Sequence, residues 1–212
     1  MGKAIEKIAI SKKHEIHSIV NCQSDLKKIN LSTADIGIEF TNPKSAFENI
    51  SFCLKNNLPV VSGSTGWLTE LKKIEKICKK FNGSFLHSSN FSISMNNFLN
   101  LSKRLAKNLK NYDISIFEKH HIQKLDNPSG TAILLKNEIQ KYYKKNISII
   151  SRREKDIKGV HTVLYKSPFD EIKITHSVKN RDTFASGAII SAEWLIDNKG
   201  FYNFKDYLKN EK

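Results

Sequence analysis

The chain has 212 residues, 39% of them hydrophobic, which gives enough apolar surface for one large domain or two small ones. It contains no run of about 18 apolar residues and no basic segment followed by an apolar one, so we expect neither a transmembrane helix nor a signal peptide. The net charge of +14 would attract polyanions, but the lysines are scattered over every predicted helix and only four arginines are present. The pattern favours a solvated basic surface, with nucleic-acid binding as the alternative.

The three cysteines, Cys22, Cys53 and Cys78, are widely spaced and form no CxxC pair. Cys53 and Cys78 fall in apolar helical patterns that are typical of buried thiols. This use of cysteine indicates a reducing, cytoplasmic compartment and argues against a structural zinc.

The first half of the chain alternates predicted helices and strands, as in a parallel sheet with crossover helices. The helices are expected at residues 3–11, 43–57 and 69–80, and the strands at residues 16–20, 35–41, 59–61 and 84–87. Pro43 suits a first helical turn, and Thr69 is the expected cap of the Lys-rich helix. Doubly wound nucleotide-binding domains open with a strand and a Gly-rich turn, whereas residue 1 here already stands at the start of a helix.

The pattern changes after Asn90. Helices are expected at residues 95–109, 131–143, 184–196 and 204–208, and strands at residues 112–120, 147–151, 160–165 and 171–178. The turn composition of residues 167–170 predicts a hairpin between the last two strands. We therefore predict an α/β fold, with a Rossmann-like parallel sheet lacking its first strand and a second α+β domain. The first domain is expected at residues 1–90 plus 183–212, and the second at residues 91–182.

The strongest chemical signal is the run HHIQKLDNPSGTA at residues 120–132. Two histidines end a strand, Lys124 follows within a turn, and Ser129, Gly130 and Thr131 open a helix. Histidine exchanges protons near neutral pH, and an ammonium group can donate one. The free N–H groups at the helix start favour a carboxylate or phosphate. Together they predict a pocket for a small anionic substrate that undergoes proton transfer.

Simpler interpretations of the same run are polar loop histidines and an ordinary helix cap. A Ser129 nucleophile lacks the G-x-S-x-G elbow and a third triad member. A zinc site at His120 and His121 is disfavoured, because adjacent residues of a strand point to opposite faces.

The run, read from Glu118, resembles the signature of the 4-hydroxy-tetrahydrodipicolinate reductase family, also called the dihydrodipicolinate reductases. Further segments resemble the family in the same order along nearly the whole chain. They are EFTNP at residues 39–43, GSTG at 63–66, SSNFS at 88–92, SRRE at 151–154, GVH at 159–161 and the segment at 180–188. Several spaced motifs in order are far more specific than one short match.

The resemblance implies that NADH or NADPH reduces a cyclic dicarboxylate imine on the route to diaminopimelate and lysine. By this resemblance His120 is the main proton donor or acceptor and Lys124 the second proton donor. His121, Gly130 and Thr131 are then ligands of the substrate carboxylates. A hydride from the nicotinamide leaves an electron-rich intermediate that must collect a proton, and cationic groups stabilise its developing charge.

On the cofactor side, the resemblance implies that Gly63, Ser64 and Thr65 lie beside the nicotinamide and its ribose. Ser88, Ser89, Asn90 and Phe91 are implied to line the cofactor cleft near a hinge between the domains. Family members are typically homotetramers built through the sheet of the second domain, so the expected partners are a dicarboxylate substrate and further copies of the chain. Neither nucleic acid nor membrane is an expected partner.

Two departures from the family pattern stand out. The first five residues, MGKAI, match only the end of the family's G-x-x-G-x-M-G turn, so we expect about ten further residues, a strand and a turn, upstream in frame. Asn21 stands where an acidic residue would favour NAD, and the nearby Lys27 and Lys28 give no clear sign of NADP. The choice between NADH and NADPH stays open. So do a degraded, non-catalytic homologue and a reductase of another substrate.

Overall fold

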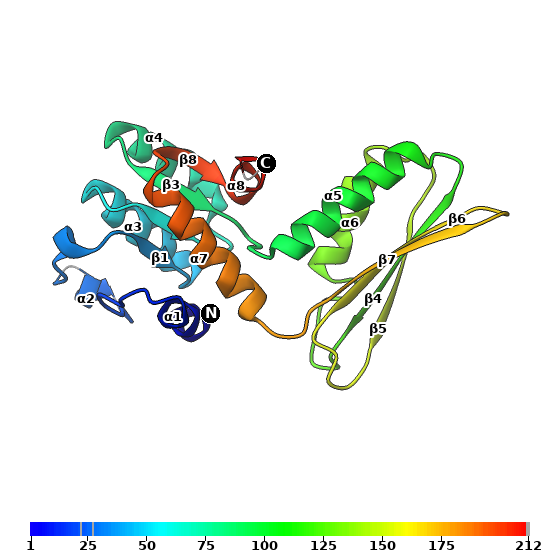
Figure 1. Cartoon of the computed structure of the whole chain (residues 1–212), viewed down its shortest axis with the longest axis horizontal. Coiled ribbons are helices and arrows are strands. Elements are labelled where there is room, and N and C mark those ends of the chain that lie inside the picture. Colours follow the sequence, from blue (N-terminus) through cyan, green and yellow to red (C-terminus); the bar gives the residue numbers. More distant parts are fainter. Residues whose placement is uncertain (22, 27, 211–212) are drawn as a thin grey trace. The chain divides into compact units, whose positions relative to one another are not determined.

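The computed structural model describes residues 1–21, 23–26 and 28–210. The chain divides into two compact units, shown in Figure 1. Unit 1 comprises Met1–Ser92 and Arg181–Lys212, and unit 2 comprises Ile93–Asn180. The expectations for Cys22 and Lys27 lie outside the described residues.

Unit 1 is built on a parallel sheet with the strand order β1-β2-β3-β8, as the alternation of helices and strands predicts. The strands are β1 (Gly37–Glu39), β2 (Val60–Ser62), β3 (Ser84–His87) and β8 (Gly200–Asn203). The helices are α1 (Gly2–Ser11), α2 (Gln23–Leu26), α3 (Pro43–Lys55), α4 (Leu71–Lys80), α7 (Asp182–Ile196) and α8 (Phe204–Asn210).

Helices cover both faces of this sheet. Val60 and Phe85 pack into a core with α3 and α4, whereas α7 also contacts β2 and β3. Neighbouring residues of a strand point to opposite faces, and the whole of β2 is buried. Cys53 and Cys78 are buried free thiols within that core, as predicted.

Two expectations for unit 1 are wrong, and one strand was not expected. Residues 16–20 form no strand, and Ile16 and Ile19 are 39% and 58% exposed. A strand needs the backbone groups of a neighbour, and among the described residues no strand lies beyond β1. Thr69 does not cap α4, because Leu68–Glu70 form a 3-10 turn and the helix follows Glu70. Strand β8 was not expected, since four residues after Gly200 give too short a pattern.

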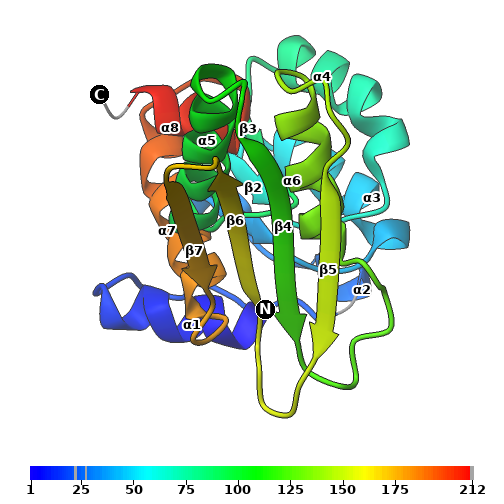
Figure 2. The same ribbon diagram turned by 90° about the vertical axis from the view of Figure 1, so that its right-hand side faces the viewer.

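Unit 2 has a mixed sheet in the order β5-β4-β6-β7. The strands are β4 (Asp113–His120), β5 (Ser148–Arg153), β6 (Val160–Lys166) and β7 (Glu171–Ser177), and the helices are α5 (Ile93–Asn108) and α6 (Gly130–Gln140). Figure 2 shows both helices behind the sheet. The predicted hairpin of β6 and β7 is confirmed, with the Ser167 N–H donating to the Asp170 carbonyl at 2.9 Å.

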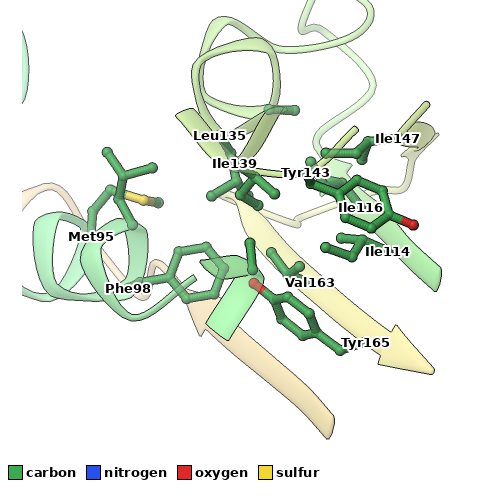
Figure 3. Close-up of a cluster of buried hydrophobic side chains, with 13 residues drawn as sticks. Met95, Phe98, Ile114, Ile116, Leu135, Ile139, Tyr143, Ile147, Val163 and Tyr165 are labelled. Atoms are coloured by element: carbon green, nitrogen blue, oxygen red, sulfur yellow. The ribbon is translucent and has the colours of Figure 1, made fainter. Parts of the chain in front are cut away.

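The core of unit 2 sits between the sheet and its helices, as Figure 3 shows. Ile114 and Ile116 contribute to it from β4, and the phenol of Tyr165 donates to the carbonyl of Ser102 at 2.7 Å. Because the side chains of a strand alternate, Glu118 and His120 continue the same buried row of β4. The apolar row of β4 therefore ends in two polar side chains. Among the described residues, no helix is long and apolar enough to cross a membrane.

Candidate active site

A buried carboxylate–imidazole pair ends strand β4. Glu118 is 1% exposed and His120 is 7% exposed. Glu118 Oε2 lies 2.6 Å from His120 Nδ1, close enough for an ion pair although the two groups are not aligned as a hydrogen bond. A carboxylate beside Nδ1 favours the tautomer that carries its proton there, which leaves Nε2 of His120 with a lone pair.

The other carboxylate oxygen of Glu118 accepts hydrogen bonds from neighbouring residues. Glu118 Oε1 accepts the Ser129 N–H at 3.1 Å and both terminal nitrogens of Arg153 at 3.2 Å each. Burial acts to raise the pKa of Glu118, but hydrogen bonding from Ser129 and the positive charge that His120 can carry lower it to about 2. The carboxylate is therefore ionised at every pH at which an enzyme of this kind would work.

The imidazole of His120 is neutral near pH 7. Burial lowers its pKa below the ordinary 6.5, Lys124 and Arg153 lower it further, and only Glu118 opposes them. Gly159 lies against this ring: a Cβ there would stand 3.3 Å from His120 Nε2. The absence of a side chain at Gly159 leaves the basic nitrogen uncovered on that side.

A second buried histidine faces the pair from β6. His161 is opposite Glu118 in the antiparallel register, and its ring centroid lies 5.0 Å from that of His120. His161 Nε2 is 3.2 Å from Ser129 Oγ, the cap of α6. Burial, and then the charge of His120, lower the pKa of His161 to about 4, so it is neutral and supports the cap.

Glu118, His120 and His161 offer ligand atoms that lie within 4.8 Å of one another, which meets a minimal requirement for a metal site. Two ligands of a tetrahedral zinc ion, each about 2.0–2.2 Å from the metal, stand well over 3 Å apart. The 2.6 Å between the Glu118 and His120 atoms is shorter than this. The arrangement suits a direct carboxylate–imidazole contact better than a metal ion.

The predicted anion site holds a carboxylate of the chain itself. Lys124 Nζ lies 2.7 Å from Asp126 Oδ1, and the Gly130 N–H donates to Asp126 Oδ2 at 3.2 Å. The hydrogen bond from Lys124 lowers the pKa of Asp126. A Cβ built at Gly130 meets no atom within 4 Å, so the start of α6 opens onto free space. The ammonium group and the helix amide thus converge on one carboxylate.

The remaining predicted substrate ligands adjoin these groups in the chain. His121 directly follows β4 and is half-buried, and its Nδ1 is buried without a hydrogen-bond partner. Thr131 is half-buried in the first turn of α6. Within the described residues, neither side chain is hydrogen-bonded to Lys124 or Asp126.

The predicted cofactor residues lie in unit 1 at the carboxyl ends of two parallel strands, where open α/β sheets bind their ligands. Gly63, Ser64 and Thr65 follow β2, and residues 88–91 follow β3. Their hydroxyl and amide groups are polar and uncharged, which fits a ribose and a nicotinamide amide. The Phe91 ring is 1% exposed between the rings of Phe40 and Phe204, so only its backbone could face a cofactor.

Sequence reasoning assigned no role to Arg153 or His161, although both lie in segments that resemble the family. Arg153 reaches Glu118 because β5 runs parallel to β4, and His161 reaches it through the antiparallel pairing of β6. Those pairings join residues more than thirty positions apart. No short-range pattern in the chain signals them.

A Rossmann-type parallel sheet joined to a separate mixed sheet is an architecture found in two-domain dinucleotide-dependent oxidoreductases. Residues 1–91 match the family model for the dihydrodipicolinate reductase N-terminus, and residues 94–208 match that for its C-terminus. The chain belongs to the dihydrodipicolinate reductase family of NAD(P)H-dependent oxidoreductases, as its motifs predict. A pyridine nucleotide is therefore the supported cofactor class.

Individual relatives agree with this assignment. The chain is 40% identical to a 4-hydroxy-tetrahydrodipicolinate reductase of Christiangramia forsetii, over 99% of this chain and 94% of the relative. It is 38% identical to the enzyme of that name from Buchnera aphidicola subsp. Cinara cedri, over 88% and 76% of the two chains. A solved dihydrodipicolinate reductase from a Paenisporosarcina species, with dipicolinate bound, has a TM-score of 0.76 at 22% identity, over 93% of this chain and 83% of its own. At that identity the likeness shows the fold.

Proposed function

We propose that this chain reduces 4-hydroxy-tetrahydrodipicolinate to tetrahydrodipicolinate with NADH or NADPH, a step toward diaminopimelate and lysine. The relatives of the same family that carry this name support the proposal. The observation that carries it is the convergence of the Lys124 ammonium group and the Gly130 amide on one carboxylate, that of Asp126. A substrate carboxylate has the same charge and shape and would take that place.

The second part of the proposal concerns the proton. The reaction consumes a hydride and a proton and releases water, and the bound nicotinamide supplies the hydride. His120, neutral and with Nε2 basic, exchanges a proton with the substrate, while Glu118 stabilises the cationic form of the ring. The Lys124 ammonium group is the second proton donor, and its charge stabilises the electron-rich ring that follows hydride transfer. His121 and Thr131 are proposed to complete the carboxylate sites.

Unit 1 would hold the cofactor through Gly63, Ser64, Thr65 and residues 88–91. Asn21 at the surface carries no charge to attract or repel a 2′-phosphate, so the proposal includes both nucleotides. The choice between NADH and NADPH is tested by measuring kcat/KM with each.

We further propose a homotetramer built through the sheet of unit 2. The face of this sheet opposite α5 and α6 presents Phe117 and Leu164, both partly exposed, and Ile150, which is 43% exposed. Three large apolar side chains on one open sheet face would be buried by a second copy of the chain.

The test is a purified-protein assay for oxidation of reduced nucleotide that depends on 4-hydroxy-tetrahydrodipicolinate. Substrate-dependent oxidation with at least one nucleotide is the expected result. Absence of turnover with both nucleotides, together with salt-sensitive retention of DNA in a gel shift, would instead support the nucleic-acid-binding alternative.

A further inference from the structure

Glu39 is a buried acid of unit 1 that opens the EFTNP segment, and the resemblance assigned this residue no individual role. It ends strand β1 and is 5% exposed. Its Oε1 accepts hydrogen bonds from the Thr41 N–H at 2.8 Å, the Thr41 hydroxyl at 2.6 Å and the Ser64 hydroxyl at 2.7 Å. Its Oε2 accepts one from the Ser62 hydroxyl at 2.6 Å. Burying a carboxylate is unfavourable unless donors replace its water, and here four donors do so.

These bonds join the carboxyl ends of neighbouring strands. Thr41 follows β1, whereas Ser62 and Ser64 belong to the end of β2 and the loop after it. Backbone bonds extend the link, from the Gly63 N–H to the Glu39 carbonyl at 2.9 Å and from the Ser88 N–H to the Ser62 carbonyl at 3.1 Å. The loops that end β1, β2 and β3 are thereby fixed to one another.

Glu39 also decides which groups of these loops remain free. The hydroxyls of Thr41 and Ser64 both point at the buried carboxylate. The Trp67 indole, 2% exposed, holds the Ser64 carbonyl at 2.9 Å. Gly63 and the exposed Thr65 are left at the carboxyl edge of the sheet, where a dinucleotide binds in such folds.

We propose that Glu39 is a positioning residue for the pyridine nucleotide: its carboxylate clamps the loops after β1 and β2 in the conformation that receives the cofactor. The proposal rests on the proposed function, because it requires unit 1 to bind a reduced nicotinamide nucleotide. Glu39 acts through its hydrogen bonds to the loops and is not itself a cofactor ligand.

The test is equilibrium titration of the full chain with NADH and with NADPH. Binding is monitored by the quenching of tryptophan fluorescence, which gives the Kd of each nucleotide. Glu39→Gln keeps an acceptor for Thr41 and Ser64, and its amide can donate to the Ser62 hydroxyl, which is free to rotate. Its Kd is expected to stay within about threefold of wild type, whereas Glu39→Ala is expected to raise the Kd about tenfold or more. Ile74→Val, on the buried face of α4 in the core of unit 1, is the control for general loss of stability and should leave the Kd unchanged.

Ser62→Ala provides the comparison if Glu39→Ala does not fold, because it removes one donor and should weaken binding about threefold. Wild-type affinity in a folded Glu39→Ala or Ser62→Ala protein would overturn the proposal. Equal weakening in Glu39→Gln and Glu39→Ala would overturn it as well, since hydrogen bonding would then not be the cause. Failure of the wild-type chain to bind either nucleotide would reject the proposed function itself, a result that the variants cannot mimic.

Discussion

Glu118 and His120 lie two residues apart on the buried face of β4, with Oε2 of the acid 2.6 Å from Nδ1 of the imidazole. The spacing follows from the two-residue period of a strand, which also places Ile114 and Ile116 in the core on the same face. The same row of side chains thus packs the domain at one end and presents a titratable pair at the other. The pair has its fixed position because the core beneath it is close-packed.

Replacing Glu118 with Gln should lower the pKa of His120 further, because the carboxylate is the charge that opposes the effects of burial, Lys124 and Arg153. His161, the other titratable group beside His120, stays neutral in both proteins. We expect kcat/KM to fall about 100-fold, a typical contribution of acid–base catalysis. NMR titration of the His120 ring measures the pKa directly.

A double variant separates positioning from general damage. If Glu118 acts through His120, Glu118→Gln combined with His120→Asn should be no less active than His120→Asn alone. Losses that multiply in the double variant would show that Glu118 acts independently of the imidazole.

Lys124→Ala should lower kcat about 100-fold or more, since a proton donor is lost, while the fold stays intact. The ammonium group of Lys124 is paired with Asp126 in an exposed loop, and the Lys124 side chain is 25% exposed. Lys119→Ala is the matched control, because Lys119 lies in the same region and is paired with Glu154, 2.9 Å away. Circular dichroism checks the fold and initial rates give kcat. Near-normal turnover of Lys124→Ala would remove Lys124 from the mechanism.

Gly159→Ala should impair the site by two routes. Gly159 has a φ of +156°, which strains any side chain, and the added Cβ would stand 3.3 Å from His120 Nε2. We expect a loss of about 1–3 kcal/mol in the free energy of unfolding and a fall in kcat. Gly2→Ala, whose Cβ meets no atom within 4 Å, is the control and should not lower stability. Chemical denaturation and initial rates give both quantities, and an active, stable Gly159→Ala protein would contradict the expectation.

His161 should make unit 2 sensitive to acid. Its pKa is lowered from 6.5 to about 4 in the folded protein, so below pH 6.5 the unfolded chain binds a proton that the folded chain rejects. Stability is therefore lost as the pH falls from about 6.5 to 4, by up to about 3 kcal/mol in total. Urea unfolding at several pH values measures the loss, and His161→Gln should flatten the curve in this window. An unchanged slope in the variant would contradict the assignment.

Ile150→Asp should weaken self-association through unit 2, because a charge on an apolar sheet face is costly to bury against another copy. Sedimentation velocity measures the assembly, which is expected to be a tetramer for wild type and smaller for the variant. Lys107→Asp on α5, which covers the other face of the sheet, changes charge at an exposed site away from this face and serves as control. A monomeric wild-type protein would refute the proposed tetramer.

How far the sequence predicts this molecule depends on the range of the interactions involved. Strand β4 was expected at residues 112–120 and runs from Asp113 to His120, because alternation along one strand is a local signal. The expected strand at residues 16–20 does not form, because no neighbouring strand among the described residues pairs with it. Local composition does not reveal whether such a neighbour is present. Lys124 and Gly130 both contact the Asp126 carboxylate within one short loop. Their proximity could be predicted because all three residues belong to one short motif.

The residues that hold the site residues in position could not be predicted in the same way. Arg153 and His161 reach Glu118 only through the register of three strands, and Glu39 reaches Ser64 across two parallel strands. These are buried polar contacts between distant segments, and a single sequence carries no short-range signal for them.

The most direct measurement follows deuterium from the reduced nicotinamide into the product. With cofactor deuterated at the transferred position, mass spectrometry of the tetrahydrodipicolinate formed by the wild-type chain should find one deuterium per molecule, and Lys124→Ala should form little product. A chain that oxidises no cofactor, or a product without the label, would contradict the account.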